Sequence, residues 1–269
     1  MKKLTRRQFI TGGILAGAGL VLADAFWYER SFVNWKEFNL SNHSNPIKII
    51  QISDLHLRNI NNIHRAIAKR INEVNPDLIF FTGDTIDNHR HMDMLNEFLS
   101  LIKKDIKKIA ILGNWEYWGE LNLEHLKQMY GAYHCELLIN ESTKVNVKGR
   151  EVSIAGMDDW VAGNPDFELV KKTLKPADLT IFLVHCPGYR EVIEKQKGDL
   201  KIDFVLSGHT HGGQVNIFGF APYKPKGSGK YLSGWYEESE PKLYVSKGVG
   251  TSIFPVRFNS RSEVAIFNV

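Results

Sequence analysis

Hydrophobic positions alternate between two spacings from residue 46 onward. The run "IKIIQISDLHL" is β-rich and apolar, and Ile60, Ile63, Ile67 and Ile71 then recur along one helix face. The runs "PDLIFFTGD" and "KIAILGN" repeat the strand pattern. Further helices in this half are expected at Met92–Lys103 and Leu121–Tyr130. Strands that alternate with helices predict a largely parallel sheet.

The second half of the chain is richer in strands. Strands are expected in "CELLIN", "TKVNVKG", "REVSIAGMDD", "DLTIFLVHCPG", "IDFVLSGHTHGG", "KLYVSKGVG" and "SEVAIFNV". Helices are expected at Phe167–Leu174 and Tyr189–Lys197, and a long loop over 217–241. This half therefore predicts a second sheet packed on the first, and residues 26–45 are expected to form an irregular lead-in.

The chain has 269 residues, 43% of them hydrophobic and 24% charged, which is an ordinary globular balance. Its net charge of +4 is uneven: residues 1–25 carry three of these charges, and the remainder carries +1. This near-neutral remainder has no basic stripe, so no nucleic-acid partner is expected and a nuclease is disfavoured. Two cysteines, Cys135 and Cys186, do not make a disulfide framework.

The N-terminal segment, residues 1–25, has the layout of an export signal. Arg6 and Arg7 precede a Gly/Ala-rich apolar run, and Ala23-Asp24-Ala25 matches an A-x-A cleavage pattern. The paired arginines resemble a twin-arginine signal, which implies the twin-arginine export machinery as a partner. An uncleaved membrane anchor is the alternative. We expect an exported protein of the periplasm or cell wall, with 46–269 as its functional domain.

Polar residues of metal-ligand type follow five of the expected strands. Because ligands bind at the carboxyl ends of strands in α/β sheets, these side chains are expected to converge. They are Asp54, His56, Asp84, Asn114, His185, His209 and His211. The other histidines are expected to be ordinary core or surface residues: His43, His64, His89, His91, His125 and His134.

Seven protein ligands, together with water, exceed the coordination number of one tetrahedral or octahedral ion. Two ions about 3.5–4 Å apart that share one carboxylate would use them all. Mixed carboxylate and imidazole ligands suit Mn²⁺, Zn²⁺ or Fe better than Ca²⁺.

The series D-x-H, G-D, G-N, H and G-H-x-H, in this order, resembles the calcineurin-like metallophosphoesterase superfamily. "GHTHGGQ", "YVSKGVGTSIFPVRFN" and the twin-arginine start resemble more narrowly the exported phosphodiesterases of bacterial cell envelopes. The resemblance implies a four-layer α/β/β/α sandwich of two mixed sheets, which agrees with the strand pattern.

The resemblance also implies an assignment of ligands. The first metal would take Asp54, His56, Asp84 and His211, and the second would take Asp84, Asn114, His185 and His209. Asp84 would bridge both ions, and Asp84, Asn114 and His209 would serve in catalysis. The glycines around these residues would keep this end of the sheet open for a phosphate.

One position departs from the family pattern. Many members have histidine after the asparagine, whereas this chain has Trp115, and an indole offers one N–H and no proton to a leaving group. Glu116 is expected to orient the ligands without binding a metal itself.

The implied activity is a metal-dependent phosphoesterase, most simply a phosphodiesterase or pyrophosphatase. Its partner would be a phosphorylated small-molecule, lipid or cell-wall substrate, with contact to the membrane surface. A UDP-diacylglucosamine-type lipid A precursor is an alternative substrate. A non-catalytic metal-containing binding protein is the alternative of a different class, because Trp115 would then block or repurpose the site.

Overall fold

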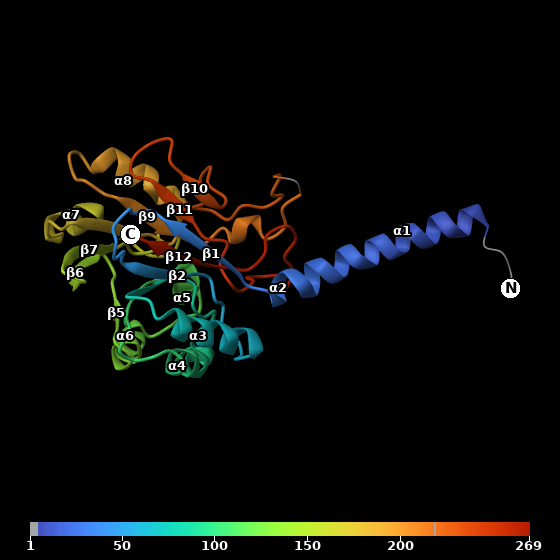
Figure 1. The fold of residues 1–269 in the computed structure, drawn as a ribbon, viewed down its shortest axis with the longest axis horizontal. Coiled ribbons are helices and arrows are strands. Elements are labelled where there is room, and N and C mark those ends of the chain that lie inside the picture. Colours follow the sequence, from blue (N-terminus) through green and yellow to red (C-terminus); the bar gives the residue numbers. More distant parts are fainter. Residues whose placement is uncertain (1–4, 218) are drawn as a thin grey trace.

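The computed structural model describes residues 5–217 and 219–269, and in these residues two six-stranded sheets form the body of the protein (Figure 1). The first sheet has the order β1 (Asn34–Asn39), β12 (Glu263–Asn268), β2 (Lys48–Ile52), β3 (Leu78–Thr82), β4 (Lys107–Ile111) and β5 (Cys135–Leu137). The second has the order β10 (Gly234–Tyr236), β11 (Leu243–Val245), β9 (Phe204–Ser207), β8 (Leu179–Leu183), β7 (Arg150–Gly156) and β6 (Glu141–Val147). Both sheets are mixed: β12 and β2 are antiparallel in the first, as are β6–β7 and β10–β11 in the second.

Three apolar layers divide the body into four layers of secondary structure. One core cluster lies between the two sheets and joins Phe80 and Ile109 to Ile181 and Leu206. A second packs the first sheet against three helices, and a third packs the second sheet against two. These helices are α3 (Asn62–Val74), α4 (Met92–Ser100) and α6 (Leu123–Ala132), then α7 (Phe167–Thr173) and α8 (Arg190–Gln196). The predicted α/β/β/α sandwich is confirmed.

The apolar runs of the sequence form strands that are buried on both faces. Every residue of β3 is buried, because helices cover one side of the sheet and the second sheet covers the other. Helix α3 follows the predicted spacing: Ile67 and Ile71 face the core. It begins at the side-chain cap of Asn61 and ends where Asn75 takes the left-handed conformation.

Two segments expected to be irregular contain strands. Residues 34–39 form β1, which pairs in parallel with β12, and the ring of Phe38 stacks on Phe267 at 5.5 Å. Within the expected loop 217–241, β10 pairs with β11 and places Trp235 opposite Tyr244. In both cases an aromatic side chain packs across the sheet, a long-range contact that alternation along the chain does not reveal.

The N-terminal helix projects away from the body (Figure 1). It runs through α1 (Arg6–Ala23), the π-helical turn η1 (Asp24–Tyr28) and α2 (Glu29–Ser31). Among the described residues, the 23-residue stretch Arg6–Tyr28 is the one helix with the length and composition to cross a membrane, a property that signal sequences share.

Short helices complete the structure at the carboxyl ends of the strands. They are η2 (His89–His91), α5 (Asn114–Trp118), η3 (Pro187–Tyr189) and η4 (His211–Gly213).

Candidate metal centre

All seven predicted ligand residues are buried at the carboxyl ends of strands. Asp54 and His56 follow β2, Asp84 follows β3, and Asn114 opens α5 after β4. His185 follows β8, and His209 and His211 follow β9. Six of the seven form two groups, each with ligand atoms within 4.8 Å of one another. The other histidines lie outside both groups.

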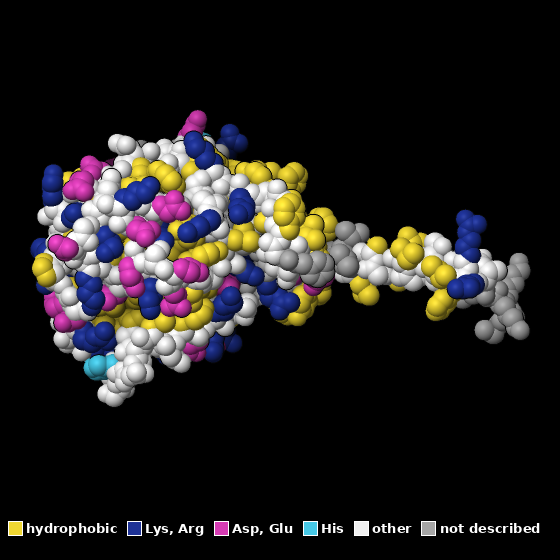
Figure 2. Space-filling view, turned by 90° about the horizontal axis from the view of Figure 1, so that it is seen from above, with side chains coloured by type: hydrophobic (Ala, Val, Ile, Leu, Met, Phe, Trp, Pro, Cys, Tyr) yellow, Lys and Arg dark blue, Asp and Glu magenta, His cyan; other side chains and the backbone are white. Residues whose placement is uncertain are grey.

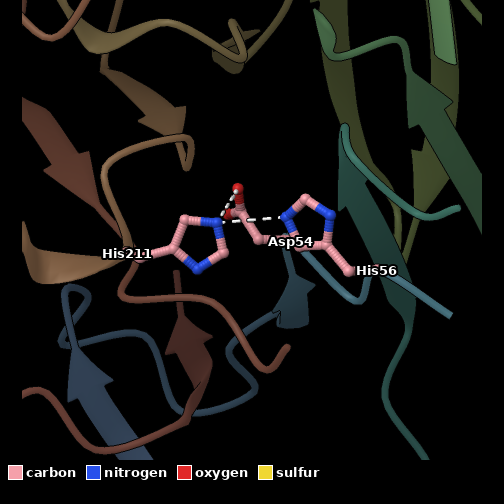
Figure 3. A group of neighbouring side chains, drawn as sticks. All are labelled: Asp54, His56 and His211. Carbon is pink, nitrogen blue, oxygen red and sulfur yellow. Dashed lines mark hydrogen bonds and ion pairs between the residues drawn. The ribbon is translucent and has the colours of Figure 1, made fainter. Parts of the chain in front are cut away.

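The first group contains Asp54, His56 and His211, which point toward one another, the first two from the loop after β2 and His211 from the segment after β9 (Figure 3). The Nε2 atoms of His56 and His211 are 3.1 Å apart, and His211 Nε2 lies 3.5 Å from Asp54 Oδ1. Two imidazole nitrogens at this distance need a proton or a cation to share.

The second group contains Asp84, His185 and His209. His185 Nε2 lies 3.1 Å from Asp84 Oδ2 and 3.2 Å from His209 Nδ1. The same Asp84 oxygen is 3.8 Å from His56 Nε2 in the first group. One carboxylate therefore reaches both groups, as a bridging ligand must.

The outward ring nitrogens of three histidines have acceptors as partners. His56 Nδ1 pairs with the Asp87 carboxylate, His185 Nδ1 with Thr82 O at 2.8 Å, and His209 Nε2 with Lys226 O at 2.7 Å. Each acceptor holds the ring proton on the outward nitrogen, so the inward nitrogen keeps its lone pair for a cation.

Asn114 supplies a further sign that the site fits metal ions. Its side-chain oxygen is buried and has no hydrogen-bond partner among the described residues. Leaving a buried acceptor unsatisfied costs about 1–3 kcal/mol, so such an atom calls for a ligand. A cation in the second group is a partner that this oxygen can bind.

His211 differs from the other three histidines in its outer partner. Its Nδ1 lies 3.2 Å from Nη2 of the buried Arg257, and a guanidinium can only donate. The main chain of His211 is held separately, because Ser260 Oγ donates to its carbonyl oxygen. Burial, together with the neighbouring His56 and Arg257, keeps the pKa of His211 well below its ordinary value. This ring is therefore neutral, as a metal ligand must be.

The two carboxylates have opposite pKa shifts. Burial raises the pKa of Asp54. Burial acts the same way on Asp84, but the neighbouring His185, together with His56 and the Trp115 N–H, lowers the pKa of Asp84 below its usual range. Burial, supported by His185, lowers the pKa of His209 to about 4, so this ring is neutral at pH 7. Burial disfavours the charged form of His185, but the neighbouring carboxylates, Asp84 above all, raise its pKa well above the ordinary value. Buried carboxylates beside imidazoles form an electrostatic environment that suits divalent cations.

The backbone at the site is strained. Five of the seven ligand residues have positive φ, a conformation that costs non-glycine residues of order 1–3 kcal/mol each and clusters at functional sites. They are Asp54 (51°), His56 (46°), Asp84 (53°), His209 (75°) and His211 (50°). The sharp turns that follow the strands turn these side chains inward.

The neighbouring glycines make room for ligand side chains. A Cβ at Gly113 would overlap the Asp84 carboxylate, and a Cβ at Gly208 would overlap Ser53 and Asp54. We expected these glycines to leave space for a phosphate. The structure differs, because the space is already filled by the ligands themselves.

Glu116 supports the ligand loops without joining either group. Its buried carboxylate accepts hydrogen bonds from the backbone of Asp84 at 3.0 Å, Thr85 at 2.6 Å and Gly113 at 2.9 Å, and from the Thr85 hydroxyl at 2.8 Å. This agrees with the role expected from the sequence. Glu116 ties the loop after β3 to the loop after β4.

A cavity of about 660 Å³ opens above the second group. Asp84, Asn114, His209 and His211 line its inner end, and Trp115 stands beside them. The Trp115 ring meets His56 edge to face at 5.9 Å, while its backbone N–H donates to Asp84 Oδ1 at 2.9 Å. Trp115 thus forms part of the cavity wall and leaves the ligand groups accessible from the cavity.

Sequence reasoning missed two residues that contact the ligands. Asp87 bonds His56 and also accepts from Arg58 Nε at 2.5 Å. A second carboxylate three positions after Asp84 was the available signal for it. Arg257, 46 positions from His211, gave no local signal.

The comparisons with known proteins show the family to which this chain belongs. The family model for calcineurin-like phosphoesterase matches residues 47–213, so the chain belongs to the calcineurin-like phosphoesterase family and is a metal-dependent phosphoester hydrolase. It is 30% identical to the uncharacterized metallophosphoesterase YkuE of Bacillus subtilis over 100% of this chain and 99% of the relative.

Two further similarities span most of the chain. The phosphodiesterase YaeI of Escherichia coli is 27% identical over 99% of both chains. Among solved structures, a dimetal phosphatase from Danio rerio is 11% identical, with a TM-score of 0.47 over 76% of this chain and 88% of that chain.

Proposed function

We propose that this protein is a phosphodiesterase with a dinuclear metal centre. The observation that carries the proposal is the pair of buried ligand groups, joined by Asp84, at the inner end of the 660 Å³ cavity. Asp54, His56, Asp84 and His211 would hold the first ion, and Asp84, Asn114, His185 and His209 the second. Mn²⁺, Zn²⁺ or Fe fits this donor set.

Two bound divalent ions would supply the positive charge that stabilises phosphoryl transfer. The chain itself orients the donors. Asp87 and Thr82 fix the rings of His56 and His185, and the Trp115 amide holds one Asp84 oxygen so that the other faces both groups. The metal-binding side chains are therefore arranged before substrate binds, and preorganised charge of this kind lowers the barrier of a reaction.

The absence of a histidine at position 115 favours substrates that need little acid assistance. Trp115 provides no acidic proton beside the cavity. A phosphodiester with a good leaving group, or a pyrophosphate whose leaving group is a phosphate, suits such a site. The phosphodiesterase name carried by YaeI supports the diester.

We further propose that the substrate belongs to the cell envelope. Arg6 and Arg7 followed by an apolar helix support export by the twin-arginine machinery, with the helix as signal or anchor. The substrate would then be a lipid, a cell-wall component or a small phosphorylated molecule of the periplasm or cell wall. A UDP-diacylglucosamine-type precursor would require the body of the protein to face inward.

The test is metal-dependent turnover of an aryl phosphodiester. Protein stripped with a chelator should regain activity on bis(p-nitrophenyl) phosphate when Mn²⁺ is returned. His185→Ala should abolish this activity, and His125→Ala, which removes an exposed histidine on α6, should not. A stripped and reloaded protein without diester turnover would refute the proposal and favour a binding protein.

A further inference from the structure

The cavity opens between loops that expose large apolar side chains. We call these residues the apolar rim: Ile217, Phe220, Tyr223, Ile253 and Phe254. Tyr223, Ile253 and Phe254 line the cavity itself, and Phe254 exposes 67% of its surface. Figure 2 shows hydrophobic side chains gathered at the end of the body from which α1 emerges. Clustered exposed apolar residues of this kind mark interaction surfaces.

Residues 219–241, which form most of the segment expected to be a long loop, contain several aromatic residues, and only some of these pack inward. Tyr231 is buried and Trp235 packs on Tyr244 at 5.2 Å, as expected of residues that cover a sheet edge. Phe220 and Tyr223 remain exposed. Packing against the sheet therefore explains the aromatic residues near the end of this segment. It does not explain Phe220 and Tyr223 near its beginning, whose side chains face solvent.

The two loops of the rim form one surface. Asn216 N donates to Phe258 O and Phe258 N donates to Gln214 O, both at 2.8 Å. The Gln214 side chain also donates to Phe254 O at 2.8 Å. These bonds hold the loops together beside the cavity.

The same surface carries the base of the N-terminal helix. Arg257 N donates to Ala25 O at 2.9 Å, and Ser260 N donates to the Glu29 carboxylate at 2.8 Å. Phe26 and Trp27 are exposed at this junction, and only 6% of the apolar window within Arg6–Tyr28 is buried. An apolar helix, its aromatic base and the apolar rim thus occur at one end of the molecule (Figure 1).

The charge of this end suits an anionic surface. Residues 214–236 and 250–261 contain no aspartate or glutamate. Lys224, Lys226 and Lys230 are exposed, and the Arg261 guanidinium lies 4.9 Å from the Tyr28 ring centre. Aromatic and basic residues together are typical of the zone where a protein meets lipid headgroups.

We infer that the apolar rim rests on the surface of an anionic bilayer in which α1 is inserted, so that the cavity opens at the level of the headgroups. The cavity then takes the phosphodiester of a membrane amphiphile, a substrate class that rests on the proposed function. The helix fixes the distance of the body from the membrane, and the rim fixes its orientation.

The test places an environment-sensitive fluorophore on the rim of the full-length protein. Both native cysteines are buried, so Phe254→Cys and Phe220→Cys allow selective labelling with nitrobenzoxadiazole. Leu169→Cys is the matched control, because Leu169 is exposed on α7, which lies at the end of the body away from α1 (Figure 1). The labelled proteins are reconstituted in phosphatidylglycerol vesicles, and turnover of the soluble aryl diester is measured in each.

We expect blue-shifted emission and protection from aqueous iodide at both rim positions, with a water-exposed signal at position 169. Water-like emission and full iodide quenching at both rim positions would overturn the inference. Soluble-diester turnover in the same samples separates the two claims: rim labels exposed to water with turnover intact refute the orientation alone. Loss of all turnover in every sample, including unlabelled protein, refutes the proposed function.

Discussion

Glu116→Gln replaces the acceptor that joins the loops of Asp84 and Asn114 while keeping the side-chain volume. The carboxylate accepts four hydrogen bonds, two at each oxygen: Asp84 N and Gly113 N at Oε2, and Thr85 N and Thr85 Oγ at Oε1. Glutamine has one acceptor oxygen, so its NH₂ group must face one of these donor pairs.

The least costly orientation places the NH₂ group at Thr85, where the hydroxyl can turn to accept. The Thr85 backbone N–H then loses its acceptor, which costs about 1–3 kcal/mol when buried. The backbone N–H groups of Asp84 and Gly113 then donate to a neutral amide oxygen in place of a carboxylate oxygen, and each hydrogen bond weakens by roughly 1 kcal/mol. Relief of repulsion between Glu116 and Asp84 offsets part of this loss. We expect a net destabilisation of about 3 kcal/mol.

The assay is guanidinium unfolding of metal-free protein, together with titration of Mn²⁺. Because both joined loops carry ligands, Mn²⁺ affinity should also fall about 10–100-fold. Glu120→Gln makes the same charge change at an exposed position nearby and should alter neither quantity. A stability loss below about 1 kcal/mol with unchanged Mn²⁺ affinity would refute the role assigned to Glu116.

Three further predictions concern separate parts of the chain. Trp115→His should lower the ratio of aryl to alkyl diester turnover, since a general acid contributes roughly 10²–10⁴-fold and helps the poorer alkyl leaving group most. The same ratio in wild type and variant would contradict this role of position 115. Changing Arg6 and Arg7 to lysine should leave the protein in the cytoplasm, and normal delivery to the envelope on cell fractionation would exclude the twin-arginine route. Burial lowers the pKa of His64 from 6.5 to about 4, so its neutral form stabilises the fold above pH 6.5 and this stability is lost as the pH falls toward 4. His64→Gln keeps an acceptor for Asn61 N, and relative to this variant the metal-free wild type should lose roughly 3 kcal/mol more between pH 7 and pH 4 in chemical unfolding.

The strand ends were predictable because two local signals coincide there. A continuous apolar run marks a buried strand, and a ligand-type residue directly after it lies at the carboxyl edge of the sheet. Asp54, Asp84 and His185 were found in this way, and the structure places the first two at the carboxyl edge of the first sheet and His185 at the carboxyl edge of the second. The two-sheet architecture followed from the same runs.

Contacts between distant residues could not be read from the pattern. Arg257 reaches His211 only because the loop after β11 folds over η4, and β1 forms only because the last strand offers it an edge. The role of the glycines was also beyond local reasoning. The space beside a glycine can be filled by a neighbouring side chain or left open for a substrate. Only the folded structure shows that Asp84 fills the space at Gly113 and Asp54 the space at Gly208.

Metal content tests the central claim most directly. Wild-type protein reloaded with Mn²⁺ and freed of excess metal should hold two ions per chain, and Asp84→Asn should hold at most one and lose nearly all diester turnover. Asp93→Asn, an exposed acid-to-amide change on α4, should match the wild type in both measurements. Two ions and normal turnover in Asp84→Asn would contradict a dinuclear site joined by this carboxylate.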